Sequence, residues 1–369
     1  MGRATDDAVY TASQSGGVVT ALLLHALRQK LVEGAVVTVT RPGRPPMVEP
    51  TIATTEQGII DGQRSKYLPV PLLKVLKDVE ARQLTVAVVG LPCHLHGLYN
   101  LVDARPVLDR LIPIRIGLVC DRVMTMAGRD FLISCSGLDG ELRDLRFRDK
   151  LEGGWPGNVK AVSADGQSVV LPARARMSIK DAFTPARCRL CFDKLNIFAD
   201  LTAGDPWGIA SADKVNGESV VVARTLAGSE FLKEAVNRGA LLVRPIQYDE
   251  VVEGQKIEQR RREWRGYCEA WRGMGLELPE YHARVAAHTP QQGGKGTYLR
   301  GLQRALALDQ FQSREQLLWY VERSLVRRGR RRRLLLPIRL ARGMIRRAHR
   351  GLRRGVPSLL QRPQGRHVR

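Results

Sequence analysis

The sequence predicts an α/β protein with a mixed, largely parallel sheet covered by helices, a small β-rich insertion and a helical, basic C-terminal tail. Strand-like and helix-like segments alternate through the first 140 residues and again from residue 218 onward. Between residues 141 and 177 shorter, alternating segments replace this order, and residues 323–369 hold 17 arginines and no acidic residue. Strands that alternate with helices favour a parallel sheet with both faces covered.

The first half supplies most of the predicted sheet. An apolar segment with helical spacing, residues 17–31, predicts a helix that Gly34 caps at its C-terminus. A proline-rich turn at 41–46 precedes two helical segments, near 55–61 and 71–80. Short apolar runs predict three buried strands, at 35–40, 84–90 and 112–119.

The second half returns to the same order after the insertion. The insertion, around "FRDKLEGGWPG", is typical of hairpins. A strand, a helix at 228–238 and a further strand at 240–246 follow, and the pattern after 249 is helical and polar. We therefore predict four parts: 1–140, 141–281, a linker at 282–296 that is rich in Gly, Gln and Thr-Pro, and a helical segment at 297–369.

Composition limits the class of protein. The chain has 369 residues, enough for two domains, and a formal net charge of +22. Outside residues 323–369 there are 42 basic and 37 acidic residues, so the basic character belongs to the tail. The apolar run at 18–27 is too short to span a bilayer, and we expect a cytoplasmic protein. Six cysteines do not make a disulfide scaffold in a chain of this length.

Four of the cysteines stand where they can converge. Cys93 follows the strand at 84–90, and Cys120 ends the strand at 112–119. Open α/β sheets bind ligands at such carboxyl ends. With the Cys-x-x-Cys pair, Cys188 and Cys191, these thiols number four, as a 4Fe–4S cluster or a structural zinc requires. Burial in the core is the alternative, and for Cys135 and Cys268, which match no motif, it is the prediction.

A loop that opens into a helix, "TASQSGGVVT", offers an anion site. Ser15, Gly16 and Gly17 would present backbone N–H groups at the positive end of the helix dipole, which suits a pyrophosphate. An ordinary N-cap made of small residues explains the same letters. Asp205, in "GDPWG", either accepts a hydrogen bond from a ligand or stabilises its own turn.

Six motifs occur in the order seen in one family: "SQSGGVVTALLLHAL", "GQRSKYLPV", "GLPCHLHGL", "IGLVC", "FRDKLEGGWPG" and "CRLCFDKLNIFADLTAGDPWG". Residues 10–260 thus resemble the coenzyme F420 hydrogenase/dehydrogenase beta-subunit family. That family also includes 7-hydroxymethyl chlorophyll a reductase and ferredoxin-dependent divinyl chlorophyllide 8-vinyl reductase.

The resemblance implies an iron–sulfur flavoprotein oxidoreductase that carries FAD and a 4Fe–4S cluster. Its substrate would be an organic compound, with coenzyme F420 or a ferredoxin-like one-electron donor on the other side of the reaction. The implied cluster ligands are Cys93, Cys120, Cys188 and Cys191. The implied flavin contacts are Ser15, Gly16, Gly17, Thr20, Ser65, Lys66, Tyr67 and Asp205. Arg148, Lys150 and Trp155 would form a substrate-facing wall, and no catalytic acid is identified.

The sequence departs from the family pattern in two places. Longer members begin with a ferredoxin-like segment, whereas this chain has no cysteine before Cys93. We therefore expect no second cluster in this polypeptide and an electron donor that is a separate protein. His94 stands where the family often has Gln, next to the expected cluster. A nearby histidine such as His94 or His96 is more often structural than catalytic.

A protein of another class remains open from the residues alone: a zinc-stabilised, non-enzymatic binding protein whose tail binds nucleic acid or an anionic membrane. After Pro337, apolar residues recur every three or four positions between arginines, as in an amphipathic helix on a membrane surface. We predict that residues 323–369 make peripheral contact with the inner membrane face. The tail has no aromatic residue, which disfavours nucleic acid. A solvated, disordered tail is the alternative.

Overall fold

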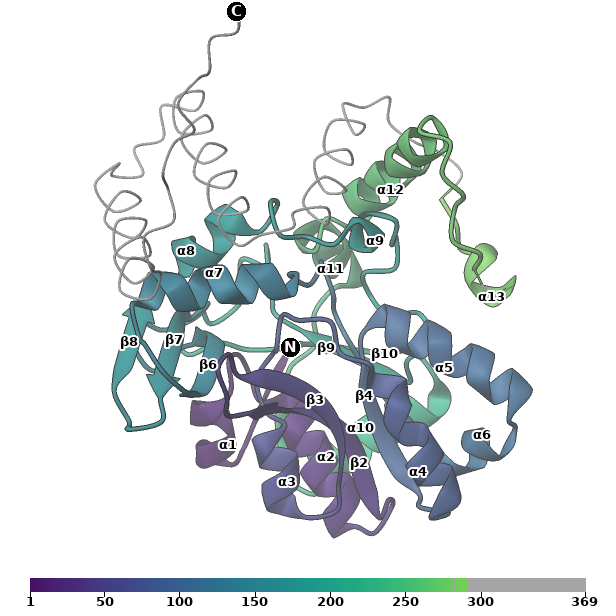
Figure 1. The fold of residues 1–369 in the computed structure, drawn as a ribbon. Helices are drawn as coiled ribbons and strands as arrows, with labels where there is room; N and C mark the ends of the chain where they lie inside the picture. Colours follow the sequence, from purple (N-terminus) through teal and green to yellow (C-terminus); the bar gives the residue numbers. More distant parts are fainter. Residues whose placement is uncertain (282, 291–369) are drawn as a thin grey trace, which may run out of the picture.

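The computed structural model describes residues 1–281 and 283–290, and its centre is a six-stranded sheet (Figure 1). In spatial order the strands are β10 (Val220–Ala223), β9 (Leu201–Gly204), β5 (Ile114–Leu118), β4 (Val86–Gly90), β2 (Gly34–Arg41) and β3 (Met47–Ala53). The four inner strands are mutually parallel, and the two edge strands, β10 and β3, are antiparallel to their neighbours. The predicted mixed, largely parallel sheet is confirmed.

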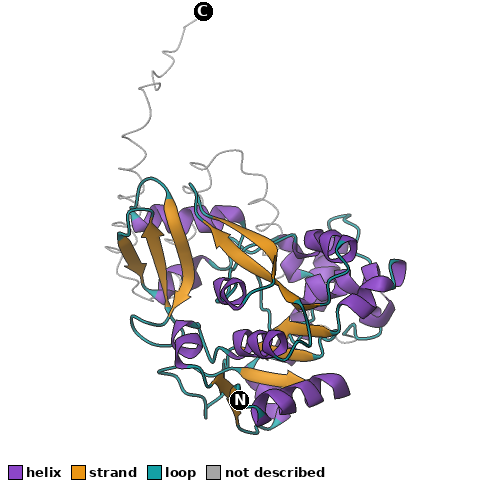
Figure 2. Ribbon diagram, turned by 90° about the horizontal axis from the view of Figure 1, so that it is seen from below, coloured by secondary structure: helices purple, strands orange, loops and turns teal. Residues whose placement is uncertain are grey.

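Helices cover both faces of this sheet (Figures 1 and 2). One face packs against α2 (Val18–Arg28), α3 (Glu56–Asp61) and α10 (Leu226–Asn237). The other packs against η1 (Leu72–Val75), α4 (Leu76–Ala81), α5 (Pro92–Ala104) and α6 (Val107–Leu111). Each face of the sheet has its own hydrophobic core, and alternate residues of one strand pack into the two cores. In β2, Val37 packs into the core of the first face and Val36 into that of the second. Side chains with a period of two therefore fill both cores.

The β-rich insertion is a separate antiparallel sheet, as predicted. It consists of β6 (Leu142–Asp149), β7 (Asn158–Ser163) and β8 (Ser168–Leu171). Two helices, α7 (Met126–Ser136) and α8 (Ala173–Ile179), lie together against it in Figure 1, and Phe131, Phe147 and Ile179 share its core. After the insertion the chain returns to the main sheet through β9 and β10.

The remaining elements lie around the two sheets. A two-stranded antiparallel sheet joins β1 (Gly2–Ala4) to β11 (Leu241–Val243), so the predicted strand near 240–246 exists but lies outside the main sheet. The remaining helices are α1 (Asp7–Ala12), α9 (Ala186–Arg189), α11 (Tyr248–Gly254), α12 (Ile257–Arg272) and α13 (Ala283–Ala286). No helix of the described residues is long and apolar enough to cross a bilayer.

One local prediction is wrong, and one strand was not predicted. Helix α2 ends at Arg28 with Gln29 as its C-cap, and Gly34 begins β2 instead of capping the helix. Strand β3 was not expected because prolines surround and enter it. Strand β3 tolerates Pro50 because it lies at the edge of the sheet and pairs with β2 only. The backbone N–H that proline lacks is therefore not needed for pairing on the outer side.

The predicted linker and tail fall mostly outside the described residues. Of the linker at 282–296, residues 283–290 are described, and they include the single turn of α13. The helical segment predicted at 297–369, with its arginine-rich tail, lies wholly outside them.

Candidate functional site

A cavity of about 610 Å³ opens at the carboxyl ends of the parallel strands. Its wall includes Val89 and Gly90 of β4, Leu118 at the end of β5, and Ala203 and Gly204 of β9. This is where open α/β sheets bind ligands, and the volume is within the range of roughly 300–1,000 Å³ for small-molecule sites. Most of the residues that the resemblance assigns to a flavin lie in this wall.

Only part of the Ser-Gly-Gly loop lines the cavity. Ser15, Gly17 and Thr20 line the cavity, and Gly17, with φ +74°, is the N-cap of α2. Gly16 is not among the lining residues, and its N–H donates to Ser219 Oγ at 3.1 Å. A Cβ on Gly16 would lie 2.4 Å from the carbonyl oxygen of Gly2. Gly16 is therefore required for close backbone packing, and its N–H is not free for a pyrophosphate.

Lys150 supports this loop from behind. Its Nζ donates to the carbonyl oxygens of Ser15 and Asn216, at 2.8 Å each. The Ser15 hydroxyl donates in turn to the carbonyl oxygen of Glu218. The prediction that Lys150 faces the substrate is wrong, because the ammonium group is used to hold the loop.

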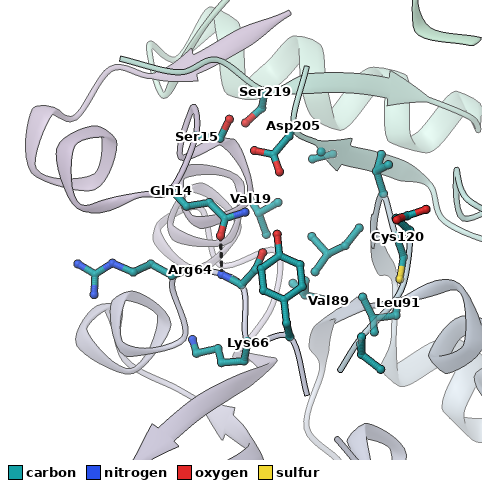
Figure 3. A pocket seen from close by; sticks show the side chains of 18 of the residues that line it. Gln14, Ser15, Val19, Arg64, Lys66, Val89, Leu91, Cys120, Asp205 and Ser219 are labelled. Atoms are coloured by element: carbon teal, nitrogen blue, oxygen red, sulfur yellow. Dashed lines mark hydrogen bonds between the residues drawn. The ribbon is translucent and has the colours of Figure 1, made fainter. Parts of the chain in front are cut away.

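The second predicted loop, "RSKY", is tied to the first. Ser65 N donates to Gln14 Oε1 at 3.1 Å (Figure 3). Arg64 Nε donates to the carbonyl oxygen of Ala12 at 2.8 Å. Arg64 adopts a left-handed backbone conformation, with φ +72°. Gln14, Arg64 and Ser65 all line the cavity, so the two loops form one continuous wall.

Lys66 is satisfied mainly by backbone oxygen atoms. Its Nζ donates to the carbonyl oxygens of Gly62 and Gln63, at 2.8 and 2.6 Å. In Figure 3 it points away from Ser15, Ser219 and Asp205. Burial of the ammonium group lowers the pKa of Lys66 to about 7. Lys66 lines the cavity, but a ligand anion would have to compete with two carbonyl groups for it.

Asp205 and Tyr67 belong to a buried network around Arg148. The Asp205 carboxylate accepts hydrogen bonds from Arg148 Nη1 and, at 3.2 Å, from Trp155 Nε1. Arg148 Nη1 also donates to the Tyr67 hydroxyl at 3.3 Å. The Arg148 side chain has no exposed surface, so the prediction that it faces the substrate is wrong. Its neighbours Asp205 and Tyr67, which were predicted as flavin contacts, do line the cavity.

Trp155 is half-buried and packs against a second tryptophan. Its ring centroid is 4.5 Å from that of Trp207, and Trp207, not Trp155, lines the cavity. The Arg148 guanidinium lies over both rings, 5.9 and 5.5 Å from their centroids. Of these two rings, only Trp207, in the loop after β9, is exposed to the cavity.

The four motif cysteines converge. Cys93 is the second residue of α5, Cys120 follows β5, and Cys188 and Cys191 lie in and just after α9. Burial raises the pKa of Cys120 well above its ordinary value, and negative charge on Cys191, Cys188 and Cys93 would raise it further. Cys120 also lines the cavity, as Figure 3 shows. Thiols this close to one another need a bound cation before all of them can ionise.

The thiols are not gathered around one ion. Within the described residues, no three His, Cys, Asp or Glu side chains are close enough together to hold a metal ion. A 4Fe–4S cluster spaces its four thiolates more widely than a single zinc ion does. The four thiols match the donor set of a cluster, and the nearby candidate ligands in these motifs, His94, His96 and Asp193, have hydrogen-bond partners within the protein. Cys135 and Cys268 are buried, as predicted.

The two histidines beside Cys93 both have partners within the protein. His94 Nδ1 accepts a hydrogen bond from Leu91 N at 3.2 Å, and burial lowers the pKa of His94 to about 4. His96 Nε2 lies 2.9 Å from Asp193 Oδ2. Of the two, His94 lines the cavity.

Sequence reasoning missed a group of side chains that hold the Cys-x-x-Cys loop. Arg260 of α12 donates to the carbonyl oxygen of Cys188, and Trp264 Nε1 donates to that of Leu190 at 3.1 Å. Tyr281 also donates to Leu190. Outer groups of this kind orient the ligands of a metal site. Their signal in the sequence is weak: Trp264 is one aromatic residue of the polar helical segment "QRRREWRGYCEAWRG", Arg260 is one of its several arginines, and Tyr281 lies beyond it.

Family models match most of the described chain. Residues 1–77 match the model of the coenzyme F420 hydrogenase/dehydrogenase beta subunit N-terminal part, and residues 84–249 match that of its C-terminal part. The matched ranges contain every predicted flavin contact and cluster ligand.

Several curated proteins are similar in sequence. The coenzyme F420 hydrogenase subunit beta of Methanothermobacter thermautotrophicus is 28% identical over 291 residues, which cover 75% of this chain and 95% of that protein. An uncharacterized protein of Methanocaldococcus jannaschii is 27% identical over 259 residues, 67% of this chain and 64% of that protein. The coenzyme F420-dependent sulfite reductase of the same organism is 27% identical over 243 residues, 61% of this chain and 36% of that protein.

One solved structure has a similar fold. It is a chain of the F420-reducing NiFe hydrogenase complex from Methanosarcina barkeri. The TM-score is 0.57 and the sequence identity 20%, over 75% of this chain and 94% of that one.

Proposed function

The chain belongs to the coenzyme F420 hydrogenase/dehydrogenase beta-subunit family, and we propose that it is an oxidoreductase that uses FAD and one 4Fe–4S cluster. It passes electrons between a one-electron donor such as a ferredoxin, or coenzyme F420, and an organic substrate. Relatives are by name F420 hydrogenase subunits and an F420-dependent sulfite reductase, which supports a redox function and a protein partner.

One observation carries the proposal: Cys120 belongs both to the converging thiols and to the wall of the cavity. Two cofactors held on either side of this residue would be adjacent. A flavin exchanges electrons singly with a cluster and in pairs with organic substrates, so adjacency is what this chemistry needs. Four thiols alone would be equally compatible with zinc, and a cavity alone would not indicate a redox cofactor.

The cluster ligands in this proposal are Cys93, Cys120, Cys188 and Cys191. The Cys-x-x-Cys loop is held at its backbone by Arg260, Trp264 and Tyr281. These contacts fix the positions of the sulfur atoms before a cluster binds, which reduces the ordering that binding requires. Cys120, Cys188 and Cys191 are half-buried, which limits the access of water to their side of the site, whereas Cys93 is exposed.

The FAD contacts come from the two linked loops at the start of α2 and before Tyr67. Ser15, Gly17 and Thr20 offer backbone and hydroxyl groups at the start of a helix, Ser65 the neighbouring loop, and Trp207 an aromatic face. Charged side chains around the cavity are mostly basic, which suits the diphosphate of FAD. They are Arg64, Lys66, Arg122, Arg176, Lys180, Lys194, Lys256 and Arg260, against Asp121, Asp205 and Glu263.

A comparison of two cysteine variants tests the cluster. Cys120→Ser should lose the electron paramagnetic resonance signal of a reduced cluster in anaerobically purified protein, because a hydroxyl is a poor ligand for iron. Cys135→Ser, in the core of the insertion and outside the four motifs, is the matched control and should keep the signal. A full signal in Cys120→Ser, or equal loss in both variants, would contradict the assignment.

A further inference from the structure

Arg176 is a buried cation whose charge the protein does not neutralise. It lies on α8, its relative exposure is 8%, and its Nε has no hydrogen-bond partner. No ion pair joins its guanidinium to a carboxylate anywhere in residues 1–281 or 283–290. Its guanidinium lies over the ring of Tyr67, whose centroid is 5.0 Å from the Arg176 Cζ atom. A buried charge without a partner is costly, so its retention needs an explanation.

The nearby acidic group cannot supply the missing partner. Asp205 is already bonded to Arg148 and to Trp155. Two buried guanidinium groups thus face one carboxylate, and one positive charge is left over. Burial lowers the pKa of Arg176, and the charge on Arg148 adds to this effect.

The leftover charge faces the cavity. Arg176 and Tyr67 both line it, with Lys180 one helical turn after Arg176. Lys180 is paired to Asp121, so it is less available than Arg176. The side chain that approaches a ligand with unused N–H donors from this wall is Arg176.

We propose that Arg176 binds an anionic group, a phosphate or carboxylate, of the ligand in this cavity, with the group held against the face of Tyr67. This inference rests on the proposed function only in that it names a contact of the same site. A guanidinium presents paired N–H donors that match both anions, and its stacking on Tyr67 fixes its plane. The anion belongs either to the flavin cofactor or to a separate substrate.

The test uses Arg176→Gln, with Arg174→Gln as the matched control. Arg174 is exposed on the same helix and does not line the cavity, so both variants lose one charge from α8. Flavin and iron contents of the purified full-length proteins are measured first. Thermal unfolding is then followed with and without inorganic pyrophosphate at constant ionic strength. At about 100 times its dissociation constant, pyrophosphate should raise the midpoint of any form with a free site by roughly 3–6 °C.

Loss of flavin in Arg176→Gln but not in Arg174→Gln supports the proposal and assigns the anion to the cofactor. Retained flavin with loss of the pyrophosphate shift supports it and assigns the anion to a second ligand. In either case Arg176→Gln without ligand should unfold at a temperature no lower than the wild type, because an unpaired buried charge is gone. A structural role for Arg176 predicts the opposite.

The proposal is overturned if Arg176→Gln keeps its flavin and responds to pyrophosphate as Arg174→Gln does, including the case in which neither responds. If Arg176→Gln does not fold, Arg176→Lys replaces it, and at least a tenfold weaker retention of flavin or pyrophosphate is expected. Wild-type protein without flavin or iron would instead contradict the proposed function. The change in unfolding temperature with pyrophosphate would then test the anion contact of Arg176 independently of the proposed function.

Discussion

At the scale of single residues, the protein satisfies many of the polar groups that the sequence assigns to a ligand. Ser15 donates to a backbone carbonyl, Lys66 to two, and Asp205 accepts from Arg148 and Trp155. Groups with internal partners give a cavity its shape, whereas groups without them are available to a ligand. This contrast identifies Arg176, which the sequence did not single out.

Lys66 offers a test of this internal satisfaction. Its folded-state pKa, about 7, lies below the ordinary value of 10.5. Between these values the unfolded chain binds more protons than the folded one, so stability rises with pH. The cost of the buried charge is complete below pH 7 and is relieved as the pH approaches 10.5. Part of the side chain reaches solvent, which reduces the effect to about 1–3 kcal/mol.

We therefore expect the free energy of unfolding to rise from pH 7 to pH 10 more steeply in the wild type than in Lys66→Met, by that amount. Urea titrations of both proteins at several pH values provide the measurement. Lys74→Met, at an exposed position of η1, should follow the wild type. Parallel curves for the wild type and Lys66→Met would mean that the ammonium group is well solvated.

At the scale of elements, the pair of Arg148 and Asp205 joins the two sheets. Arg148 lies in β6 of the small sheet, and Asp205 directly follows β9 of the main sheet. Arg148 is fully buried and Asp205 largely so, with side-chain exposures of 0% and 11%. Loss of one partner of a buried pair leaves the other charge without compensation.

Asp205→Asn is therefore expected to lower the free energy of unfolding by about 3–5 kcal/mol. The matched control is Glu56→Gln, which breaks the exposed pair of Arg28 and Glu56 and should cost less than about 1 kcal/mol. Urea unfolding at pH 7 measures both. Equal, small losses in the two variants would show that the sheets are held together mainly by apolar packing.

The elements also show what the sequence can predict. Strands β2, β4 and β5 are recognisable because each is a short, buried apolar run, and parallel strands bring their carboxyl ends together. That is why the convergence of Cys93 and Cys120 could be expected. Strand β3 escapes recognition because its prolines argue against a strand, and only its place at the sheet edge permits them.

The role of Asp205 could not be predicted for a different reason. Its partner Arg148 is 57 residues earlier in the chain, on another sheet. Local patterns report the period of a helix or strand, but they do not report which side chains of separate elements meet. The same holds for Arg260, which bonds to Cys188 across 72 residues.

At the scale of the whole molecule, charge is divided unevenly. Residues 323–369 account for 17 of the 22 net positive charges, and they lie outside the described residues. The contact of this tail with anionic membrane therefore stays a prediction. Deletion of 323–369 should leave flavin and iron contents unchanged and should sharply reduce sedimentation with phosphatidylserine vesicles, since each basic residue contributes about 1 kcal/mol near such a surface.

Added salt should have the same effect as the deletion, because screening acts over about 8–10 Å at physiological ionic strength. Binding of the full chain to DNA with a steep salt dependence, without binding to vesicles, would favour a nucleic-acid partner instead. Loss of flavin or iron on deletion would show that the tail is part of the oxidoreductase body.

The central claim is that one polypeptide holds a flavin beside an iron–sulfur cluster. The measurement that tests it most directly is the content of iron, zinc and flavin in the anaerobically purified protein. The account predicts about four iron atoms and one flavin per chain, and no stoichiometric zinc. About one zinc per chain with neither iron nor flavin would contradict it and would favour a zinc-stabilised binding protein.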